Sequence, residues 1–472
     1  MADRAESIIL GGGLAGLAAG WTLAHAGRKV LVLESAAEVG GLARTVACGE
    51  FRFDLGGHRW FTTDTRVEAL VRTLLGAELQ QVARASRILL RGKYIDYPLR
   101  PVNAILGLGL MTTLRILLDY ARAQVARRGG EPPLISLEDW VVSRFGRELF
   151  EIYFKQYSEK VWGLDCREIS AQWVARRIQG LSLGQAIGAA LFRFARPRLP
   201  TLAEEFLYPR LGIGRIAASL GAGIEAAHGR VHTGARVTRV ERSRRRIDGV
   251  AVRRAEGDAF LRASEFVSSI PLSALVRLLD PPAPGAVRAA AARLRWRDLV
   301  VVAVLLGRPR VTDQTWIYLP EKRVPFARLH EPTNWSAAMA PPGRTLLVAE
   351  YFCFAGDATW SAADEMLAED TVRHLARLGF IRPEDVVGTR VLRVPQAYPL
   401  FELGYERHTQ VIADYLAGFE NLHLAGRGGM FQYYNMDHAM ASGLEAAAHV
   451  LSRPRAGLLA AGTEPVAAGG RR

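Results

Sequence analysis

Cysteine is scarce in this chain of 472 residues, and its three cysteines, Cys48, Cys166 and Cys353, lie far apart. They show neither the dense spacing of a disulfide scaffold nor the paired spacing of a zinc site. The sequence therefore favours a reducing compartment. We predict a cytoplasmic protein without a metal centre.

Long apolar runs are also missing. No stretch reaches about 18 uncharged apolar residues, the length that a transmembrane helix needs. The nearest candidate, residues 104–118, is interrupted by Thr112, Thr113 and Arg115. We interpret it as an amphipathic core helix, with an interfacial helix as the alternative. We expect no signal peptide and no integral membrane span, while peripheral membrane contact stays open.

A concentrated basic patch is absent, although Lys and Arg exceed Asp and Glu by 61 to 47, a net charge of +14. Only residues 242–246 and the last two residues form local basic clusters. We expect no nucleic-acid partner, because such proteins concentrate their charge on one face. An anionic substrate remains compatible with the excess. The length predicts two or three substructures.

A nucleotide-binding pattern occupies the first forty residues. An apolar run at residues 7–10 precedes a glycine turn, an Ala- and Leu-rich segment and a second apolar run that ends at Glu34. Gly11 permits the tight turn, Gly13 lets the backbone approach a pyrophosphate, and Gly16 lets helix and strand pack closely. The pattern predicts dinucleotide contacts from Gly11, Gly13, Leu14, Ala15, Gly16, Glu34 and Ser35.

A second glycine turn follows at residues 38–44. The segment from Glu34 to Arg44 resembles the extended FAD fingerprint of the superfamily that contains amine oxidases, phytoene desaturases and protoporphyrinogen oxidases. The resemblance implies FAD as the cofactor, with its pyrophosphate along Gly41, Leu42, Ala43 and Arg44. The alternative is a surface turn with an incidental arginine.

The same resemblance implies the fold class. We expect an α/β protein, α+β overall, with a Rossmann-type FAD-binding domain on a parallel sheet and a substrate domain on a mixed or antiparallel sheet with an inserted helical region. The FAD-binding parts are predicted at residues 1–85, 206–280 and 401–453. The helical or substrate region is predicted at 86–205, the substrate sheet at 281–400 and a disordered tail at 454–472.

Several local elements are also predicted. Helical periodicity marks residues 67–77 and 137–151, and Gly92 centres a β-hairpin over 87–97. Residues 123–133 and 197–209 are predicted to be a loop and a connection, and residues 229–240 a pair of strands.

The flavin face is predicted from both ends of the chain. Residues 55–61 resemble the stretch that passes the isoalloxazine ring in the UDP-galactopyranose mutase branch, which implies ring contacts from Gly57 and His58. A packed core histidine is the alternative for His58. Residues 426–437 resemble a signature of the same branch, and a strand near Val237 resembles the adenine contact. The resemblance implies further cofactor contacts from Gly426, Arg427, Asn435, Met436 and Asp437.

Substrate contacts are predicted from the middle of the chain. Residues 324–331 resemble a phosphate-contacting segment of the mutase branch, which implies that Arg328 binds an anionic group. The alternative is a surface arginine paired to Glu331. The other diphosphate arginine of that branch falls near Gly180, where Arg176 or Arg177 could replace it. The resemblance implies His58, Arg328, Tyr398 and Tyr433 as catalytic residues.

These observations predict an FAD-dependent oxidoreductase, like protoporphyrinogen oxidase or an amine oxidase, that oxidises a small organic substrate over the flavin ring. The alternative is a non-redox, flavin-dependent nucleotide-sugar mutase like UDP-galactopyranose mutase. A binding protein with a vestigial flavin fold is a third class. We expect a small-molecule substrate, for which an anionic or nucleotide-linked compound is one option, and the sequence makes no prediction of oligomeric state.

Overall fold

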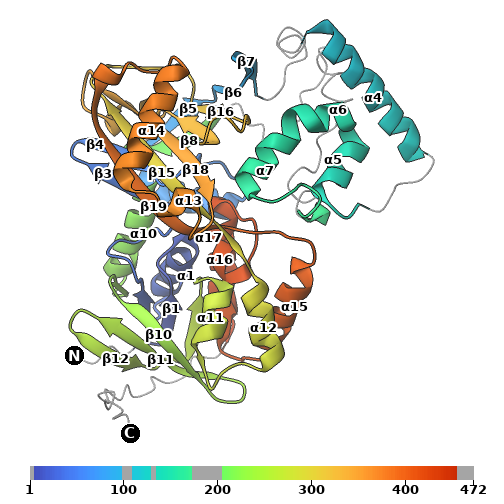
Figure 1. Cartoon of the computed structure of the whole chain (residues 1–472). Coiled ribbons are helices and arrows are strands. Elements are labelled where there is room, and N and C mark those ends of the chain that lie inside the picture. Colours follow the sequence, from blue (N-terminus) through green and yellow to red (C-terminus); the bar gives the residue numbers. More distant parts are fainter. Residues whose placement is uncertain (1–4, 98–108, 129–133, 173–204, 454–472) are drawn as a thin grey trace.

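The computed structural model describes residues 5–97, 109–128, 134–172 and 205–453 (Figure 1). The predicted tail, Arg176, Arg177 and Gly180 lie outside these residues. The described chain has a parallel sheet covered by helices, a larger mixed sheet above it in the view of Figure 1, and a helical region to one side. This arrangement confirms the predicted fold class.

A five-stranded sheet forms the base of the molecule, in the order β20-β13-β1-β2-β9, and every neighbouring pair is parallel. Two of its three inner strands, β1 and β2, are buried along their whole length, as expected where helices cover both faces of a parallel sheet. The strands are β1 Ser7–Leu10, β2 Val30–Leu33, β9 Arg230–His232, β13 Glu265–Ser268 and β20 Leu422–Leu424.

Helix α1 packs against α17 and α10. A Cβ at Gly443 would lie 2.1 Å from the Ala15 carbonyl oxygen, so glycine is what allows α17 to pack this closely on α1. The helices around this sheet are α1 Leu14–His25, α2 Thr65–Leu75, α10 Gly214–Ala226, α11 Leu272–Leu278, α12 Gly285–Arg293, α15 Tyr405–Leu416, α16 Gly426–Met430 and α17 Met436–Leu451.

The predicted strand pair at 229–240 exists, but its two strands belong to different sheets. Strand β9 pairs with β2, whereas β10 pairs antiparallel with β11. The turn between them is held by hydrogen bonds from Gly234 N to Ala36 O and from Ala235 N to Glu34 O, which direct the chain away from the first sheet. The second sheet has the order β12-β11-β10-β14 and contains β10 Arg236–Arg242, β11 Ile247–Arg254, β12 Gly257–Leu261 and β14 Leu279–Asp280.

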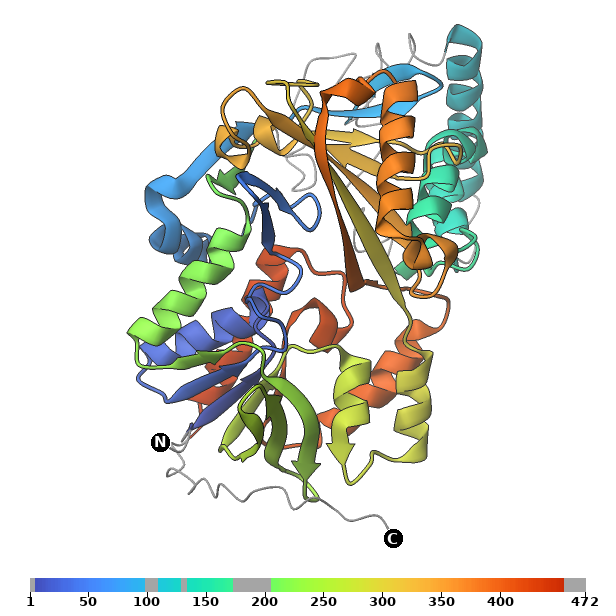
Figure 2. The ribbon, with the colours of Figure 1, turned by 60° about the vertical axis from the view of Figure 1, so that its left-hand side comes forward.

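The larger sheet has seven strands in the order β19-β15-β18-β17-β16-β6-β7. The β16–β6 pair is parallel and the others are antiparallel, so the sheet is mixed as predicted. Figure 2 shows α14 lying across it. The elements are β6 Ser86–Leu90, β7 Lys93–Asp96, β15 Trp296–Leu306, β16 Trp316–Tyr318, β17 Arg328–His330, β18 Thr345–Cys353, β19 Val386–Pro399, α13 Ala358–Ser361 and α14 Asp364–Arg377.

The helical region corrects two predictions. The predicted loop at 123–133 is wrong for residues 123–128, which continue α4 because Ala, Gln and Arg are good helix formers. The predicted helix at 137–151 is interrupted at Gly146, whose φ of +86° and missing Cβ accommodate Asp119 of α4. The elements are α4 Leu110–Arg128, α5 Leu137–Phe145, α6 Arg147–Leu149, a π-helix Phe150–Lys155 and α7 Gln156–Trp162.

Two short antiparallel pairs complete the described structure. The predicted connection at 197–209 is wrong for its last five residues, which form β8 Glu205–Pro209 and pair with β5 Leu79–Ala83. The remainder of that prediction lies outside the described residues. The second pair joins β4 Phe51–Asp54 to β3 Thr45–Cys48.

Candidate active site

The two glycine turns lie side by side at the N-terminus of α1. Gly11 has a φ of +103°, and a Cβ at Gly16 would lie 2.0 Å from the Gly11 carbonyl oxygen, so both glycines are required for the turn. Gly40 N donates to Gly12 O at 2.7 Å, which joins the second turn to the first.

The space in front of these turns fits a pyrophosphate. A Cβ at Gly13 would meet nothing within 4 Å, and α1 begins there without a hydrogen bond from a capping side chain. Its first N–H groups and the positive end of the helix dipole are suited to an anion. Arg44 is held beside this space by a bond from its Nε to Gly41 O at 3.0 Å.

Glu34, one of the predicted dinucleotide contacts, supports the first glycine turn. Its Oε2 accepts from Gly12 N at 2.7 Å, and its Oε1 accepts from Ala36 N at 2.8 Å and Ser35 Oγ at 3.3 Å. A carboxylate oxygen has a second lone pair, so a further hydrogen bond from a ligand hydroxyl remains available. Val237 follows shortly after the turn that is bonded to Glu34 O.

The C-terminal part of the predicted cofactor site packs against α1. Gly426 has a φ of +80°, and a Cβ there would lie 2.9 Å from the Ala15 Cβ. Helix α17 begins at Met436 with Asn435 as its N-cap, without a side-chain capping bond, and Asp437 lies in its first turn. Segments from opposite ends of the chain therefore meet at α1, as the FAD prediction requires.

Gly57 is fixed between a tryptophan ring and a buried carboxylate. A Cβ on Gly57 would lie 1.2 Å from an atom of the Trp316 ring, so no side chain fits there. Gly57 N donates to Glu350 Oε1 at 3.1 Å, and Arg328 Nη1 donates to Glu350 Oε2 at 3.3 Å. Arg328 and Glu350 are register partners on β17 and β18. Burial raises the pKa of Glu350, although Arg328 and the Gly57 N–H act in the opposite direction.

Arg328 is surrounded by aromatic side chains. Its Nε donates to the Tyr157 hydroxyl at 2.9 Å and its Nη1 to the Tyr398 hydroxyl at 3.3 Å, and its guanidinium lies 4.7 Å from the Phe352 ring centroid. The alternative pairing with Glu331 does not occur. Glu331 is buried and accepts from Val311 N, Thr312 N and Thr345 Oγ1 instead.

Arg427 and two tyrosines form the adjoining wall. The Arg427 guanidinium lies 5.1 Å from the Tyr398 ring centroid and 5.6 Å from that of Tyr433, and the two rings stack at 6.2 Å. Backbone carbonyls of Tyr434 and Ala397 accept from Arg427 and fix it. Predicted cofactor and catalytic residues are thus in direct contact.

His58 lies close enough to these groups to be affected by their charge. Burial, and secondly the charge of Arg427, lower the pKa of His58 to about 4, so its imidazole is neutral at neutral pH. Its Nδ1 has no hydrogen-bond partner among the described residues. An unpaired buried nitrogen is costly unless a ligand or water satisfies it, which fits a position beside a bound group.

Sequence reasoning missed Glu350 and His330. Glu350 stands as one acid inside the apolar run of β18, and that anomaly could have revealed it. His330 stacks on Trp316 at 5.5 Å. Burial, followed by the charges of His58 and Arg328, lowers the pKa of His330 to about 3.

Lys160 lies on α7 and has a structural role. Its Nζ donates to the carbonyl oxygens of Leu319, Glu321 and Phe326 at 2.7, 3.1 and 2.7 Å. These bonds tie α7 to the loop between β16 and β17. The same helix carries Tyr157, so Lys160 helps to position a residue that contacts Arg328.

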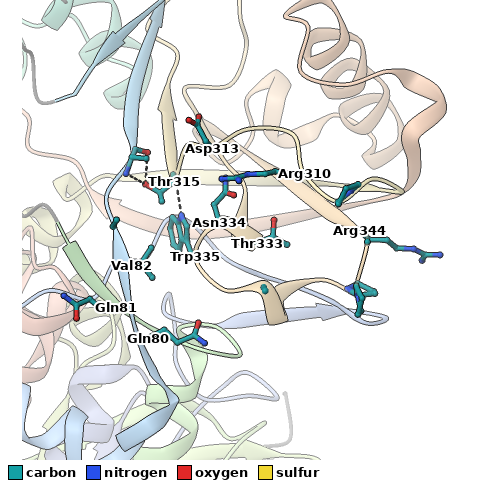
Figure 3. Close-up of a pocket in the computed structure, with 17 residues that line it drawn as sticks. Gln80, Gln81, Val82, Arg310, Asp313, Thr315, Thr333, Asn334, Trp335 and Arg344 are labelled. Atoms are coloured by element: carbon teal, nitrogen blue, oxygen red, sulfur yellow. Dashed lines mark hydrogen bonds between the residues drawn. The ribbon is translucent and has the colours of Figure 1, made fainter.

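A separate open cavity of about 800 Å³ lies beside β5 and the loops that follow β15 and β17 (Figure 3). Arg310, Asn334, Trp335 and Arg344 are among its lining residues. None of the predicted site residues lines it. The Trp335 indole is held in its wall by a bond from Nε1 to Thr315 O at 2.8 Å.

The parallel sheet with a glycine turn at a helix N-terminus defines the class of dinucleotide-binding α/β proteins. Residues 14–451 match the family model described as flavin containing amine oxidoreductase, and the chain belongs to this family. The family confirms the predicted superfamily and FAD as the cofactor.

Curated relatives match over short segments. Amine oxidase [flavin-containing] B of Sus scrofa is 29% identical over 187 residues, 37% of this chain and 35% of the relative. The Homo sapiens protein of that name is 33% identical over 101 residues, 21% of this chain and 19% of the relative. The matched segments thus span about a third or less of these relatives.

Solved structures match over nearly the whole chain. Reduced UDP-galactopyranose mutase superposes with a TM-score of 0.81 at 23% identity over 95% of each chain. A putative protoporphyrinogen oxidase from Exiguobacterium sp. 255-15 gives 0.71 at 17% identity over 94% and 98%. Putrescine oxidase bound to putrescine gives 0.65 at 18% identity over 95% and 99%. At these identities the matches establish the fold.

Proposed function

We propose that the protein is an FAD-dependent oxidoreductase that oxidises a small, anionic organic substrate lying over the flavin ring. The observation that carries this proposal is the partly buried Arg328, whose guanidinium bonds to the hydroxyls of Tyr157 and Tyr398 and is joined to the Gly57 backbone by Glu350. Family membership supports the flavin chemistry, and the arginine cluster supports the class of substrate.

The balance of charges in the cluster around Arg328 favours an anionic substrate. Arg328 and Arg427 bring two guanidinium groups to the cluster, whereas Glu350 brings one carboxylate, so a positive charge remains for a ligand to neutralise. A guanidinium recognises carboxylate and phosphate groups through paired hydrogen bonds. The rings of Tyr398 and Tyr433 offer an apolar wall for the rest of the substrate.

Each part of the chain has a distinct task in this proposal. When bound, FAD would accept the two electrons that the substrate loses. The glycine turns and the α1 N-terminus would hold its pyrophosphate, and backbone N–H groups at the α17 N-terminus would stabilise negative charge on the ring. Arg328 orients the substrate, and the surrounding aromatic side chains exclude water.

An anaerobic titration tests the proposal. FAD-loaded protein is mixed without oxygen with carboxylate- and phosphate-bearing compounds, including porphyrinogen-type and polyene-type compounds and nucleotide sugars. Bleaching of the flavin absorbance by an anionic compound, with release of its oxidised form, is the expected result. The proposal fails if no anionic compound reduces the flavin.

A nucleotide-sugar mutase is the second candidate, because Arg328 with its tyrosine hydroxyls also suits a diphosphate. It predicts a different outcome in the same titration. A nucleotide sugar would then leave the oxidised flavin unchanged and be isomerised only after reduction with dithionite.

A further inference from the structure

Helix α4 presents an apolar stripe to solvent. Met111, Leu114, Leu118 and Val125 are exposed to 69%, 45%, 60% and 66%, respectively. Steps of three, four and seven residues place them on one face of the helix. Isolated exposed apolar residues are ordinary, whereas an aligned set marks an interaction surface.

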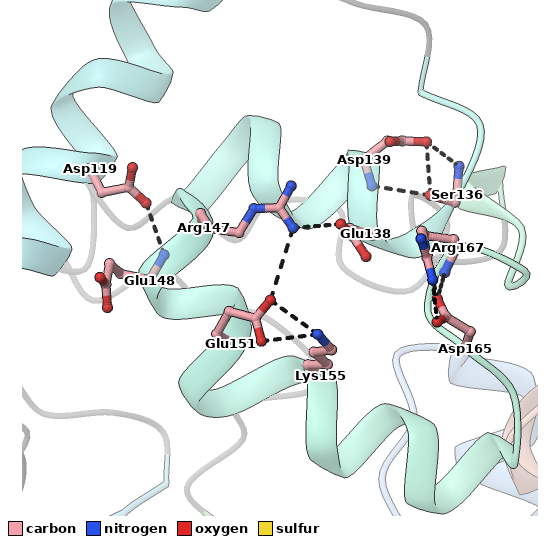
Figure 4. Close-up of polar contacts among 10 residues, drawn as sticks. All are labelled: Asp119, Ser136, Glu138, Asp139, Arg147, Glu148, Glu151, Lys155, Asp165 and Arg167. Carbon is pink, nitrogen blue, oxygen red and sulfur yellow. Dashed lines mark hydrogen bonds and ion pairs between the residues drawn. The ribbon is translucent and has the colours of Figure 1, made fainter.

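The opposite face of α4 is anchored to the helical region. Ile116 is buried, Asp119 Oδ2 accepts from Glu148 N at 2.9 Å, and Gln124 Nε2 donates to Arg144 O at 2.9 Å. Figure 4 shows Asp119 reaching from α4 to α6. Figures 1 and 2 both place α4 at the outer edge of the molecule. The stripe is therefore held outward by the fold.

The charges beside the stripe are positive. Arg115 and Arg122 are exposed, and each follows a stripe residue by four positions, Met111 and Leu118, respectively. The single acidic residue of α4, Asp119, is bonded to Glu148 N on the inner side. A second copy of this chain, presenting the same face, would bring like charges together, whereas an anionic surface would neutralise them.

We propose that α4 binds the surface of an anionic phospholipid bilayer. Met111, Leu114, Leu118 and Val125 enter the boundary between head groups and acyl chains, and Arg115 and Arg122 pair with lipid phosphates, as in helices that lie in the plane of a membrane. Within the described ranges, none of the helices is long and apolar enough to cross a bilayer. The proposed contact is peripheral, and it would hold the enzyme at the surface of the bilayer.

Vesicle co-sedimentation tests this proposal with the full-length, FAD-loaded protein. The probes are vesicles of phosphatidylcholine alone and of phosphatidylcholine mixed with phosphatidylglycerol. We expect binding to the anionic vesicles that falls with added salt. The triple variant Leu114→Ser, Leu118→Ser and Val125→Ser, and separately Arg115→Glu with Arg122→Glu, should each lower the partition coefficient about tenfold or more.

Matched controls replace exposed residues elsewhere on the surface. Met366→Ser removes a side chain that is 66% exposed on α14, and Arg288→Glu with Arg293→Glu reverses two exposed charges on α12. These controls should bind like the wild type. Unchanged flavin absorbance and melting temperature show that each variant is folded.

Two outcomes would overturn the proposal. The first is equal sedimentation of the stripe variants and the wild type, or no sedimentation of the wild type with anionic vesicles. The second is a wild-type dimer, measured by light scattering, that the triple variant converts to a monomer without any vesicle binding, because the stripe would then pack against a second copy.

Discussion

At the scale of single residues, the site depends on one buried ion pair. Arg328 and Glu350 face each other across β17 and β18, and their side chains are 13% and 0% exposed. Burying such a pair costs desolvation, which additional hydrogen bonds must offset. Tyr157, Tyr398 and the Gly57 N–H provide those bonds. The pair therefore positions a cation beside the predicted ring-contacting backbone.

Replacing Glu350 tests this arrangement. Glu350→Gln keeps an oxygen that can accept from Gly57 N but leaves Arg328 as an uncompensated buried charge, so we expect a loss of about 3–5 kcal/mol in the free energy of unfolding. Millimolar phosphate should restore part of the lost free energy of unfolding by binding to Arg328. Glu68→Gln breaks the exposed pair with Arg72 and should cost under about 1 kcal/mol. A Glu350→Gln variant as stable as Glu68→Gln in denaturant titrations would contradict the pairing.

The buried His330 predicts a dependence of stability on pH. Its pKa is about 3 in the folded protein and 6.5 for an unperturbed histidine, so the unfolded chain takes up the proton more readily. Stability should therefore decrease as the pH falls from about 6.5 towards 3, by about 3 kcal/mol or more. His330→Phe keeps a ring between Trp316 and Trp335 and removes this contribution. If the curves of melting temperature against pH were parallel for the variant and the wild type, His330 would not be the source of the pH dependence.

At the scale of elements, the features that could be predicted from the sequence are those that a local pattern of residues determines. Gly11 and Gly40 adopt the turns expected from their spacing, and Gly16 allows the expected close packing of α1, because these features depend on neighbouring residues. Glu350 was missed because its importance depends on the register between β17 and β18, which no local pattern encodes. The contact of Tyr157 with Arg328 was missed for the same reason, since 171 residues separate the two. The interruption of the helix at Gly146 depends on Asp119 of another helix.

The α1 N-terminus provides a test of the nucleotide cradle. Gly13→Asp places a side chain and a negative charge in the open space that the pyrophosphate is predicted to fill, so we expect purified protein without bound FAD. Gly285→Asp is a matched control, because it also stands at a helix N-terminus with nothing within 4 Å of its added Cβ. Absorbance near the flavin bands and FAD released on heating give the measurement. Normal FAD content in Gly13→Asp would place the cofactor elsewhere.

At the scale of the whole molecule, the parts of the chain converge on one cluster. His58 comes from the N-terminal part, Tyr157 from the helical region, Arg328 and Glu350 from the larger sheet, and Arg427 from the C-terminal part. The order of domains along the sequence stays a prediction, and the site roles are proposals that this convergence supports. The apolar stripe of α4 lies on the helical region and shares no residue with this cluster. Catalysis and membrane binding can therefore be tested independently.

The most direct test of the central claim is anaerobic flavin reduction, followed by stopped-flow absorbance, with an anionic substrate and its uncharged ester. In the wild type we expect the rate of flavin reduction by the anion to exceed that by the ester at least about tenfold. A factor of this size corresponds to the free energy of one hydrogen bond to a charged group. Arg328→Ala should retain FAD and lose that preference. Arg323→Ala, at an exposed arginine, should behave as the wild type. Equal bleaching by the anion and the ester in the wild type, or an unchanged preference in Arg328→Ala, would contradict the account.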